Sequence, residues 1–289
     1  MSLSGKVYLV TGSTDGIGKE TAYRLAAEDA TVLIHGRSLY KGQRVANRLK
    51  SKFKNSIIDL FIADLSSFQQ IRDLSRAIHD KYDCIDVIVH NAGVFEEKRK
   101  ESEDGYELTF AVNVLAPFLL TYLLIDIVPK HSNGRIVVVS CMSHSDSIDL
   151  QDLQLEKCYD GITAYELSKL CAIMMTYEMA ERLRKLGITT NTLDPGLVDT
   201  SLLHAGWPEF HGMPAEEADS GFFLATDKQF IDVTGKYFVR NRESGSAEIS
   251  YDQTKREKLW QKLEDFTDIS FSDVISPTHV IATRADFLD

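Results

Sequence analysis

Short apolar runs alternate with longer helical patterns along most of this 289-residue chain. The runs that predict strands are residues 6–12, 31–36, 57–65, 84–93, 134–140 and 188–196, with 234–240 as a seventh candidate. Nearly continuous apolar strands indicate burial on both faces, which is typical of a parallel sheet covered by helices on both sides. The alternation therefore predicts an α/β fold with a doubly wound parallel sheet in a single domain.

The periodicity changes near the end of the chain. Helices are expected over residues 17–28, about 38–53, about 66–79, about 106–128 and about 163–185. The stretch 251–265 resembles one amphipathic helix, and residues 266–289 have no clear period. We therefore place the doubly wound domain at 1–242 and a C-terminal helix and tail at 243–289. The tail is left as a lid, an edge segment or a loose end.

Charge and composition exclude several classes of function. The net charge of −11 and a pI near 5.2 argue against nucleic-acid binding, which needs a basic surface. The longest apolar stretch, around 115–128, is interrupted by Pro117, Thr121 and Asp126, so we expect no membrane span. The four cysteines have no zinc-like spacing and are expected to be free thiols. No metal site is expected, and with no secretory signal the default location is cytoplasmic.

A glycine-rich segment, TGSTDGIGKE, follows the first predicted strand and opens the first predicted helix. Glycine allows a sharp bend and a close approach of the backbone to a pyrophosphate, and a helix N-terminus offers free N–H groups and a positive dipole end. An ordinary glycine-rich turn is the alternative. Its position between strand and helix favours a dinucleotide site in a Rossmann fold, at Gly12, Ser13, Thr14, Gly16, Ile17 and Gly18.

The end of the second predicted strand indicates which dinucleotide is bound. An acidic residue there would bind the ribose 2′-OH of NAD(H), but this chain has Gly36 followed by Arg37. A guanidinium without a neighbouring carboxylate suits a 2′-phosphate. We therefore favour NADP(H) over NAD(H), with a solvent-facing Arg37 as the alternative.

Tyr165 and Lys169 lie four positions apart in a predicted helix, so both side chains share one face. A free phenol has a pKa of about 10, and a nearby cation stabilises its phenolate. Such a tyrosine is suited to proton transfer when a carbonyl is reduced by a hydride. Taken alone, the pair is more commonly two solvated residues on an amphipathic helix.

The segments TGSTDGIG, His90–Gly93, Tyr165-x-x-x-Lys169 and Asp194–Gly196 occur in the order found in short-chain dehydrogenases/reductases, which this chain resembles over residues 4–240. Within that family, residues 134–170 look most like the retinol dehydrogenase and WW-domain oxidoreductase branch. The resemblance implies activity on lipophilic alcohols, aldehydes and ketones. It also implies that a homodimer can form through the two long helices.

The resemblance also assigns roles to residues. Tyr165 would donate or accept the proton, and Lys169 would hold the nicotinamide ribose and lower the pKa of the tyrosine. Asn113 would anchor a water molecule that links Lys169 to solvent, although a buried core amide is the alternative. Further cofactor contacts would come from Asp64, Leu65, Asn91, Ala92, Gly93, Pro195, Gly196, Val198 and Thr200. Asp64 and Thr200 could instead be helix caps.

One residue departs from the family pattern. The substrate-binding serine usually found after the fifth strand is replaced by Cys141, in the segment VVVSCMSHS. A thiol is a weak donor, and losing one good donor to an oxyanion can cost about 3 kcal/mol. Cys141 could serve in a slower enzyme, or Ser140 or Ser143 could replace it. The third reading is a cofactor-binding regulator with little turnover.

An apolar segment after Thr200 would cover the mouth of the site. Residues 201–214 include Leu202, Leu203, Trp207 and Phe210, which suit a lipophilic substrate but could also pack on the core or on a partner chain. We therefore expect an NADP(H)-dependent oxidoreductase that interconverts a lipophilic alcohol and its aldehyde or ketone. The alternative, from a different class, is the regulatory NADP(H)-binding protein.

Overall fold

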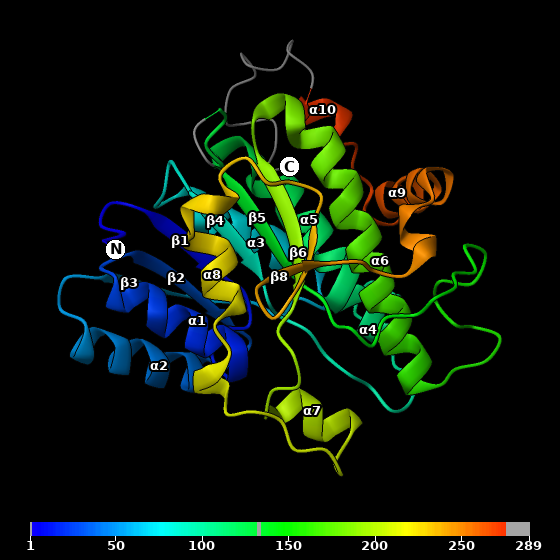
Figure 1. The fold of residues 1–289 in the computed structure, drawn as a ribbon, viewed down its shortest axis with the longest axis horizontal. Coiled ribbons are helices and arrows are strands. Elements are labelled where there is room, and N and C mark those ends of the chain that lie inside the picture. Colours follow the sequence, from blue (N-terminus) through cyan, green and yellow to red (C-terminus); the bar gives the residue numbers. More distant parts are fainter. Residues whose placement is uncertain (1, 132–133, 276–289) are drawn as a thin grey trace.

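The computed structural model describes residues 2–131 and 134–275, which form one central sheet between two layers of helices (Figure 1). Its eight strands run in the order β3-β2-β1-β4-β5-β6-β7-β8, and every neighbouring pair is parallel except β7 and β8. The predicted doubly wound fold is confirmed. The strands are β1 Val7–Val10, β2 Thr31–Gly36, β3 Ile57–Ile62, β4 Val87–His90, β5 Arg135–Val139, β6 Thr189–Asp194, β7 Tyr237–Val239 and β8 Arg242–Ser244.

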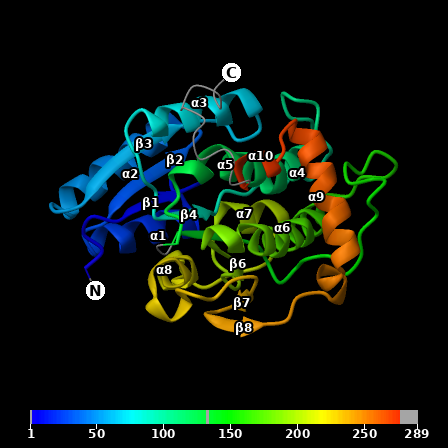
Figure 2. The same ribbon diagram turned by 90° about the horizontal axis from the view of Figure 1, so that it is seen from above.

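Apolar side chains on both faces of the sheet hold the helices in place. All residues of β2, β4, β5 and β6 are buried, as near-continuous apolar or β-branched strands require. One helical layer contains α1 Gly16–Ala27, α2 Leu39–Lys52 and α8 Ser220–Thr226. The opposite layer contains α3 Phe68–His79, α4 Leu108–Phe110, α5 Ala116–Leu124, α6 Gly161–Leu183 and α9 Gln253–Thr267 (Figure 2).

The helix at Leu108–Ile127 is the most apolar of the long helices in the described chain. It begins as α4, passes through a π-helical turn at Ala111–Leu115, continues as α5 and ends in a 3-10 turn. By length and composition it could cross a membrane, but 89% of the apolar window is buried inside the fold. Its side chains belong to the core beneath the sheet, so burial in the protein accounts for its apolar character.

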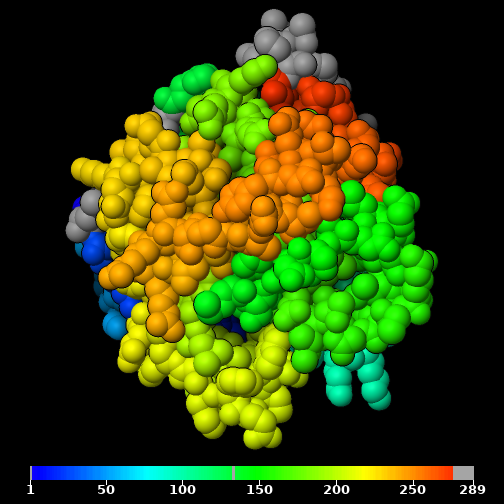
Figure 3. Space-filling view, turned by 45° about the vertical axis from the view of Figure 1, so that its right-hand side comes forward, coloured from blue at the N-terminus to red at the C-terminus, as the bar shows by residue number. Residues whose placement is uncertain are grey.

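The C-terminal helix α9 packs across α6. Asp252 caps it by accepting a hydrogen bond from the Lys255 N–H, as preferred at a helix start. The indole of Trp260 is 1% exposed and lies edge-to-face on Phe118, with ring centroids 4.8 Å apart. Arg256, 7% exposed, pairs with Glu181 of α6 at 2.5 Å. Figure 3 shows the orange C-terminal segment crossing the yellow and green surfaces.

Some elements differ from the sequence-based expectations. The seventh strand is confirmed but short, and the antiparallel β8 beyond it was not expected, because its three residues are all exposed and polar or charged. Helix α8 and helix α7, Ser201–Gly206, were also missed, since each spans less than two and a half turns. The expected tail, 266–289, starts inside α9, which runs to Thr267. Beyond it Phe271 is fully buried against Trp260, and α10 Ser272–Ile275 follows. Residues 276–289 lie outside the described part.

Replacing Trp260 tests how much α9 contributes to stability. Trp260→Ala is expected to lower the free energy of unfolding by about 3–5 kcal/mol, because it leaves a cavity between α9 and α5. Urea unfolding followed by circular dichroism measures the change. Tyr40→Ala is the control, since Tyr40 is 71% exposed and should change stability by no more than about 0.5 kcal/mol. An equal effect of the two substitutions would contradict the packing described for α9.

Candidate active site

A cavity of about 600 Å³ lies at the carboxyl ends of the strands and crosses the point between β1 and β4 where the strand order reverses. Open α/β sheets bind ligands at such switch points. Most residues predicted for the site line this cavity: Gly12, Thr14, Gly16, Ile17, Arg37, Asp64, Leu65, Asn91, Ala92, Gly93, Ser140, Cys141, Ser143, Tyr165, Lys169, Pro195, Gly196, Val198 and Thr200. Ser13, Gly18 and Asn113 lie behind it.

The glycine turn is pressed against the end of β4. A Cβ on Gly18 would lie 2.2 Å from the Nδ2 of Asn91, and one on Gly12 would lie 2.8 Å from the Cα of Ala92. Neither space admits a side chain. The Asn91 amide donates to the carbonyl of Thr11 at 2.9 Å, which ties β4 to the turn. Gly18 thus serves packing between the turn and the sheet, and the turn leaves the N-terminus of α1 facing the cavity.

His35 supports the glycine turn from β2, and the sequence analysis missed it. Its Nε2 lies 3.1 Å from the carbonyl of Ala63, which can only accept, so this nitrogen carries the proton. Its Nδ1 accepts from the N–H of Gly12 at 3.2 Å. Burial lowers the pKa of His35 to about 4, which keeps the ring neutral and able to accept. A polar residue at the end of an otherwise apolar strand was the available signal.

The end of β2 carries the residues on which the prediction of NADP(H) rests. Arg37 is exposed and lines the cavity. Ser38, the N-cap of α2, and Lys41 in its first turn also line the cavity. A Cβ on Gly36 would lie 2.5 Å from Cγ2 of Thr14, so the position has no room for a carboxylate. Lys41 adds a second cation that the sequence analysis missed, although it stands only four residues after Arg37.

Helix α6 brings Tyr165 and Lys169 to the floor of the cavity. Asp160 caps the helix through the N–H of Thr163, which sets where the helix begins. The two side chains are 5% and 4% exposed, and the Lys169 Nζ lies 5.4 Å from the centroid of the phenol ring. That nitrogen donates to the carbonyl of Val139 at 3.1 Å. The two side chains therefore lie on one buried face of α6, and not on a solvated surface of the helix.

Burial controls the ionisation of both groups. It raises the pKa of Tyr165 well above the usual value, and the neighbouring Cys141 and Asp194 raise it further. Burial also lowers the pKa of Lys169. The expected lowering of the Tyr165 pKa by Lys169 is therefore outweighed in the protein alone, because both charges must form in a dry environment. The phenol is held in its protonated form.

Cys141 lies beside the phenol at the position expected for a serine. Its thiol is close enough to Tyr165 to share a hydrogen bond, and it accepts one from the N–H of Ser143 at 3.4 Å. Burial, followed by the charge of Asp194, raises the pKa of this thiol, so it stays neutral. The buried hydroxyl of Ser140 instead donates to the backbone carbonyl of Lys169 at 3.0 Å. Ser143 is exposed at the cavity edge.

Asn113 stands in the π-helical turn, a distortion that is frequent at functional sites. Its Oδ1 accepts from the N–H of Val94 at 2.8 Å, and its Nδ2 donates to the Val94 carbonyl and to the hydroxyl of Ser168. The side chain therefore connects the segment after β4 to α6. Its role in holding a water molecule stays a prediction.

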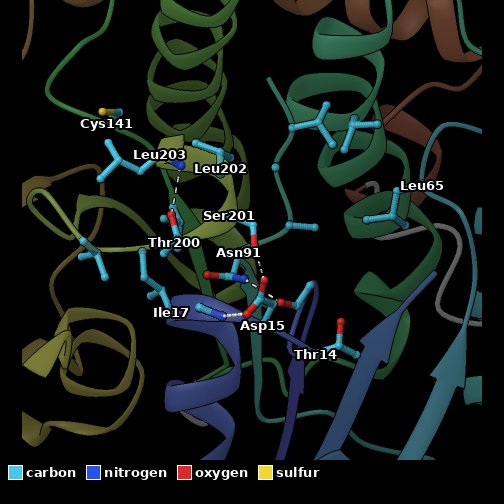
Figure 4. A pocket seen from close by; sticks show the side chains of 18 of the residues that line it. Thr14, Asp15, Ile17, Leu65, Asn91, Cys141, Thr200, Ser201, Leu202 and Leu203 are labelled. Carbon is cyan, nitrogen blue, oxygen red and sulfur yellow. Dashed lines mark hydrogen bonds between the residues drawn. The ribbon is translucent and has the colours of Figure 1, made fainter. Parts of the chain in front are cut away.

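An aromatic cluster and α7 cover the substrate side. The ring centroid of Trp207 lies 5.3 Å from that of Tyr165 and 5.4 Å from that of Phe95. Thr200 caps α7, and its neighbour Ser201 donates to Asp15 of the glycine turn at 2.7 Å (Figure 4). Asp15 lines the cavity and was not among the predicted residues. Apolar walls come from Leu202, Leu203 and Phe210.

The sequence matches the family model described as short chain dehydrogenase over residues 6–209. Human polyprenol dehydrogenase is 32% identical, covering 91% of this chain and 86% of that protein. Human retinol dehydrogenase 12 is 33% identical, covering 90% and 85% of the two chains. Mouse retinol dehydrogenase 13 is 32% identical, covering 90% and 83%.

Solved structures agree with these relatives. A protein from Mycobacterium paratuberculosis superposes with a TM-score of 0.78 at 25% identity, covering 93% of this chain and 96% of its own. A short-chain dehydrogenase from Burkholderia cenocepacia, solved in complex with NADP, has a TM-score of 0.67 at 25% identity, covering 84% and 99%. Taken with the motifs around Tyr165 and the glycine turn, these matches place the chain in the short-chain dehydrogenase family, in the branch of the retinol dehydrogenases.

Proposed function

We propose that this oxidoreductase uses NADP(H) to interconvert a lipophilic alcohol and its aldehyde or ketone. The observation that carries the proposal is the shared cavity: a glycine turn at one end and the Tyr165–Lys169 pair at the other. The same space is open to a substrate beneath α7. A dinucleotide and a small hydrophobic alcohol would meet at the phenol.

The residues around the cavity fit a nicotinamide dinucleotide. The N-terminus of α1 faces the position for a pyrophosphate, and Asp64 and Leu65 line the part expected to hold the adenine. Arg37 and Lys41 provide positive charge for a 2′-phosphate where Gly36 leaves no space for a competing acid. Pro195, Gly196, Val198 and Thr200 line the nicotinamide end. When bound, the cofactor supplies the hydride chemistry.

The protein's own side chains transfer the proton and stabilise the charge that develops in the reaction. The Tyr165 hydroxyl gives its proton to the carbonyl oxygen during reduction, or takes it from the alcohol during oxidation. The buried Lys169 ammonium stabilises the phenolate that remains, in a region where electrostatic interactions are strong because water is excluded. Cys141 is adjacent to the phenol, and its S–H group would be a weak hydrogen-bond donor to the carbonyl oxygen of the substrate. Trp207 and Phe95 shield the reacting groups from water.

The lining of the substrate side supports a lipophilic substrate. Leu202, Leu203, Trp207 and Phe210 surround it, and the relatives are named as dehydrogenases of retinol and polyprenol. Such a pocket gains about 25 cal/mol for each Å² of apolar surface that it buries. A long or bulky hydrophobic alcohol is therefore favoured over a small polar one.

A second candidate is a protein that binds NADP(H) and regulates a partner with little turnover. Two observations favour it: Cys141 replaces a stronger donor, and burial disfavours the phenolate of Tyr165. Turnover measurements on the Cys141→Ser variant separate the two candidates.

Partners and location are proposed from the net charge and from the burial of the apolar helix. The net charge of −11 speaks against nucleic acid. The apolar helix Leu108–Ile127 packs in the core, so we propose no membrane span and keep the cytoplasm as the location. If a homodimer forms through α6, its interface would have to use the part of α6 that α9 does not cover.

Tyr165→Phe tests the reaction itself. The variant is expected to lose at least a hundredfold in kcat against a panel of isoprenoid and aromatic aldehydes and ketones with NADPH, because the proton donor is gone. Tyr177→Phe, on the same helix but bonded to Ser246 outside the cavity, should keep its activity. If wild-type protein reduces no member of the panel, or the two variants behave alike, the proposed catalysis is wrong.

Arg37→Ala tests the choice of cofactor. The affinity for NADPH is expected to fall by about tenfold to a hundredfold, because a charge-assisted hydrogen bond to the 2′-phosphate is lost, while the affinity for NADH stays the same. Titration by nucleotide fluorescence measures both constants. Arg44→Ala, an exposed position on α2 that does not line the cavity, is the control. Equal affinity of the wild type for NADPH and NADH would refute the role of Arg37.

Cys141→Ser tests the thiol. A hydroxyl donates more strongly than a thiol to the developing oxyanion, so kcat is expected to rise by about tenfold. Steady-state kinetics on the best substrate of the panel measure the change. A fall in kcat would show that the thiol has a role that a hydroxyl cannot fill.

A further inference from the structure

A buried carboxylate stands directly behind the reacting groups. Asp194 is the last residue of β6, precedes Pro195 and is 1% exposed. It does not line the cavity, and no role was predicted for it beyond marking the motif. A buried acid needs partners for both oxygens, since an unpaired charge in a dry environment is costly.

Both oxygens of Asp194 accept hydrogen bonds from the backbone. Oδ2 accepts from the N–H of Met142 at 2.5 Å, and Oδ1 accepts from the N–H of Gly196 at 2.6 Å. Both donors are N–H groups, which match the acceptor oxygens of a carboxylate. The side chain thus joins two segments: the one after β5, which carries Cys141, and the one after β6, which lines the nicotinamide end of the cavity.

The charge of Asp194 also acts on the reacting groups. Burial is the main reason that the pKa values of Tyr165 and Cys141 are raised, and Asp194 adds to both effects. Asp194 also opposes the lowering of the Lys169 pKa by burial. A negative charge at this place disfavours the phenolate and favours the ammonium.

Other polar groups pack around this carboxylate and must be considered with it. From β7, Tyr237 is buried, and burial and then Asp194 raise its pKa. His144 donates from Nδ1 to the carbonyl of Cys141 at 2.8 Å, because its Nε2 accepts from the N–H of Ala247. Arg240 donates its backbone N–H to the carbonyl of Asp194 at 3.3 Å. None of these three neighbours is an acid. Asp194 therefore supplies the carboxylate of this group, and its side chain bonds to both segments beside the phenol.

We propose that Asp194 is a positioning residue that holds the Cys141 and Gly196 segments beside Tyr165 and sets the pH range of alcohol oxidation. The inference rests on the proposed function, because it concerns the same phenol. The negative charge of Asp194 raises the pH that oxidation needs, since the base form of Tyr165 forms against that charge. Reduction, which uses the protonated phenol, extends to correspondingly higher pH.

The test is the pH profile of Asp194→Asn. The amide removes the charge and can still accept one of the two hydrogen bonds. The ascending limb of kcat/KM for alcohol oxidation is expected to move by roughly one unit toward lower pH, which raises the rate about tenfold on the acid side of the midpoint. Asp194→Glu, which keeps the charge, should lower kcat through misplacement but retain the wild-type midpoint.

Asp86→Asn is the matched control. Asp86 is also buried and accepts from a backbone N–H, that of Val7 at 2.8 Å, but it precedes β4 at the amino ends of the strands, opposite the cavity. It should alter stability without moving the profile. If Asp194→Asn lowers kcat with an unchanged midpoint, or if Asp86→Asn moves the midpoint equally, the proposal is overturned.

A second measurement is independent of turnover. The ultraviolet absorbance of the wild type and of Asp194→Asn is measured against pH, and the same protein carrying Tyr165→Phe is subtracted from each. The difference reports the titration of Tyr165 alone. It is expected to shift toward lower pH in Asp194→Asn even if no substrate is turned over. Absence of turnover with this shift would defeat the proposed function alone. Absence of the shift in folded Asp194→Asn protein would defeat the role of Asp194, and Asp194→Glu provides the comparison if the amide variant does not fold.

Discussion

The close contact between the glycine turn and the end of β4 is the constraint on which the site depends. Gly18 meets Asn91 and Gly12 meets Ala92 at distances that exclude any side chain. This contact joins the first and fourth strands where the sheet changes direction, and it leaves the first turn of α1 pointing into the cavity. His35 supports the same turn from the other side as a neutral acceptor. The binding end of the site is therefore built mostly from backbone.

The reacting end is built differently, from charges held away from water. Tyr165, Lys169 and Asp194 are all at most 5% exposed, and the charge of Asp194 acts on the pKa values of the other two. In the protein alone, burial is the largest effect on the pKa values of Tyr165 and Cys141 and raises both. The phenol is therefore protonated and the thiol is neutral. A cationic nicotinamide ring beside the phenol would favour the phenolate. Under the proposed function, proton transfer from the alcohol would therefore be linked to cofactor binding.

Much of the fold could be predicted because strand burial and helix periodicity leave strong patterns. The six long strands, the helix carrying Tyr165 and the Trp260 helix all follow from such patterns. Short elements such as α7 and β8 have no period to detect, and their positions depend on contacts with distant segments. Asp194 and Asp15 were missed for a related reason: their partners, Met142 and Ser201, are far away in sequence. Hydrogen bonds to a distant backbone or hydroxyl leave no spacing to recognise.

The hydrogen bond between Ser201 and Asp15 has a consequence for how such a protein can diversify. Segment 201–214 forms a roof over the cavity, so under the proposed function it is the natural place for substitutions that admit a new alcohol. Its first residue, however, is bonded to Asp15 of the glycine turn, which is proposed to receive the pyrophosphate. A lineage that altered Ser201 would disturb nucleotide recognition together with substrate choice, whereas changes from Leu202 onward leave that bond intact. Divergence of substrate preference is therefore expected to concentrate in the later part of the roof.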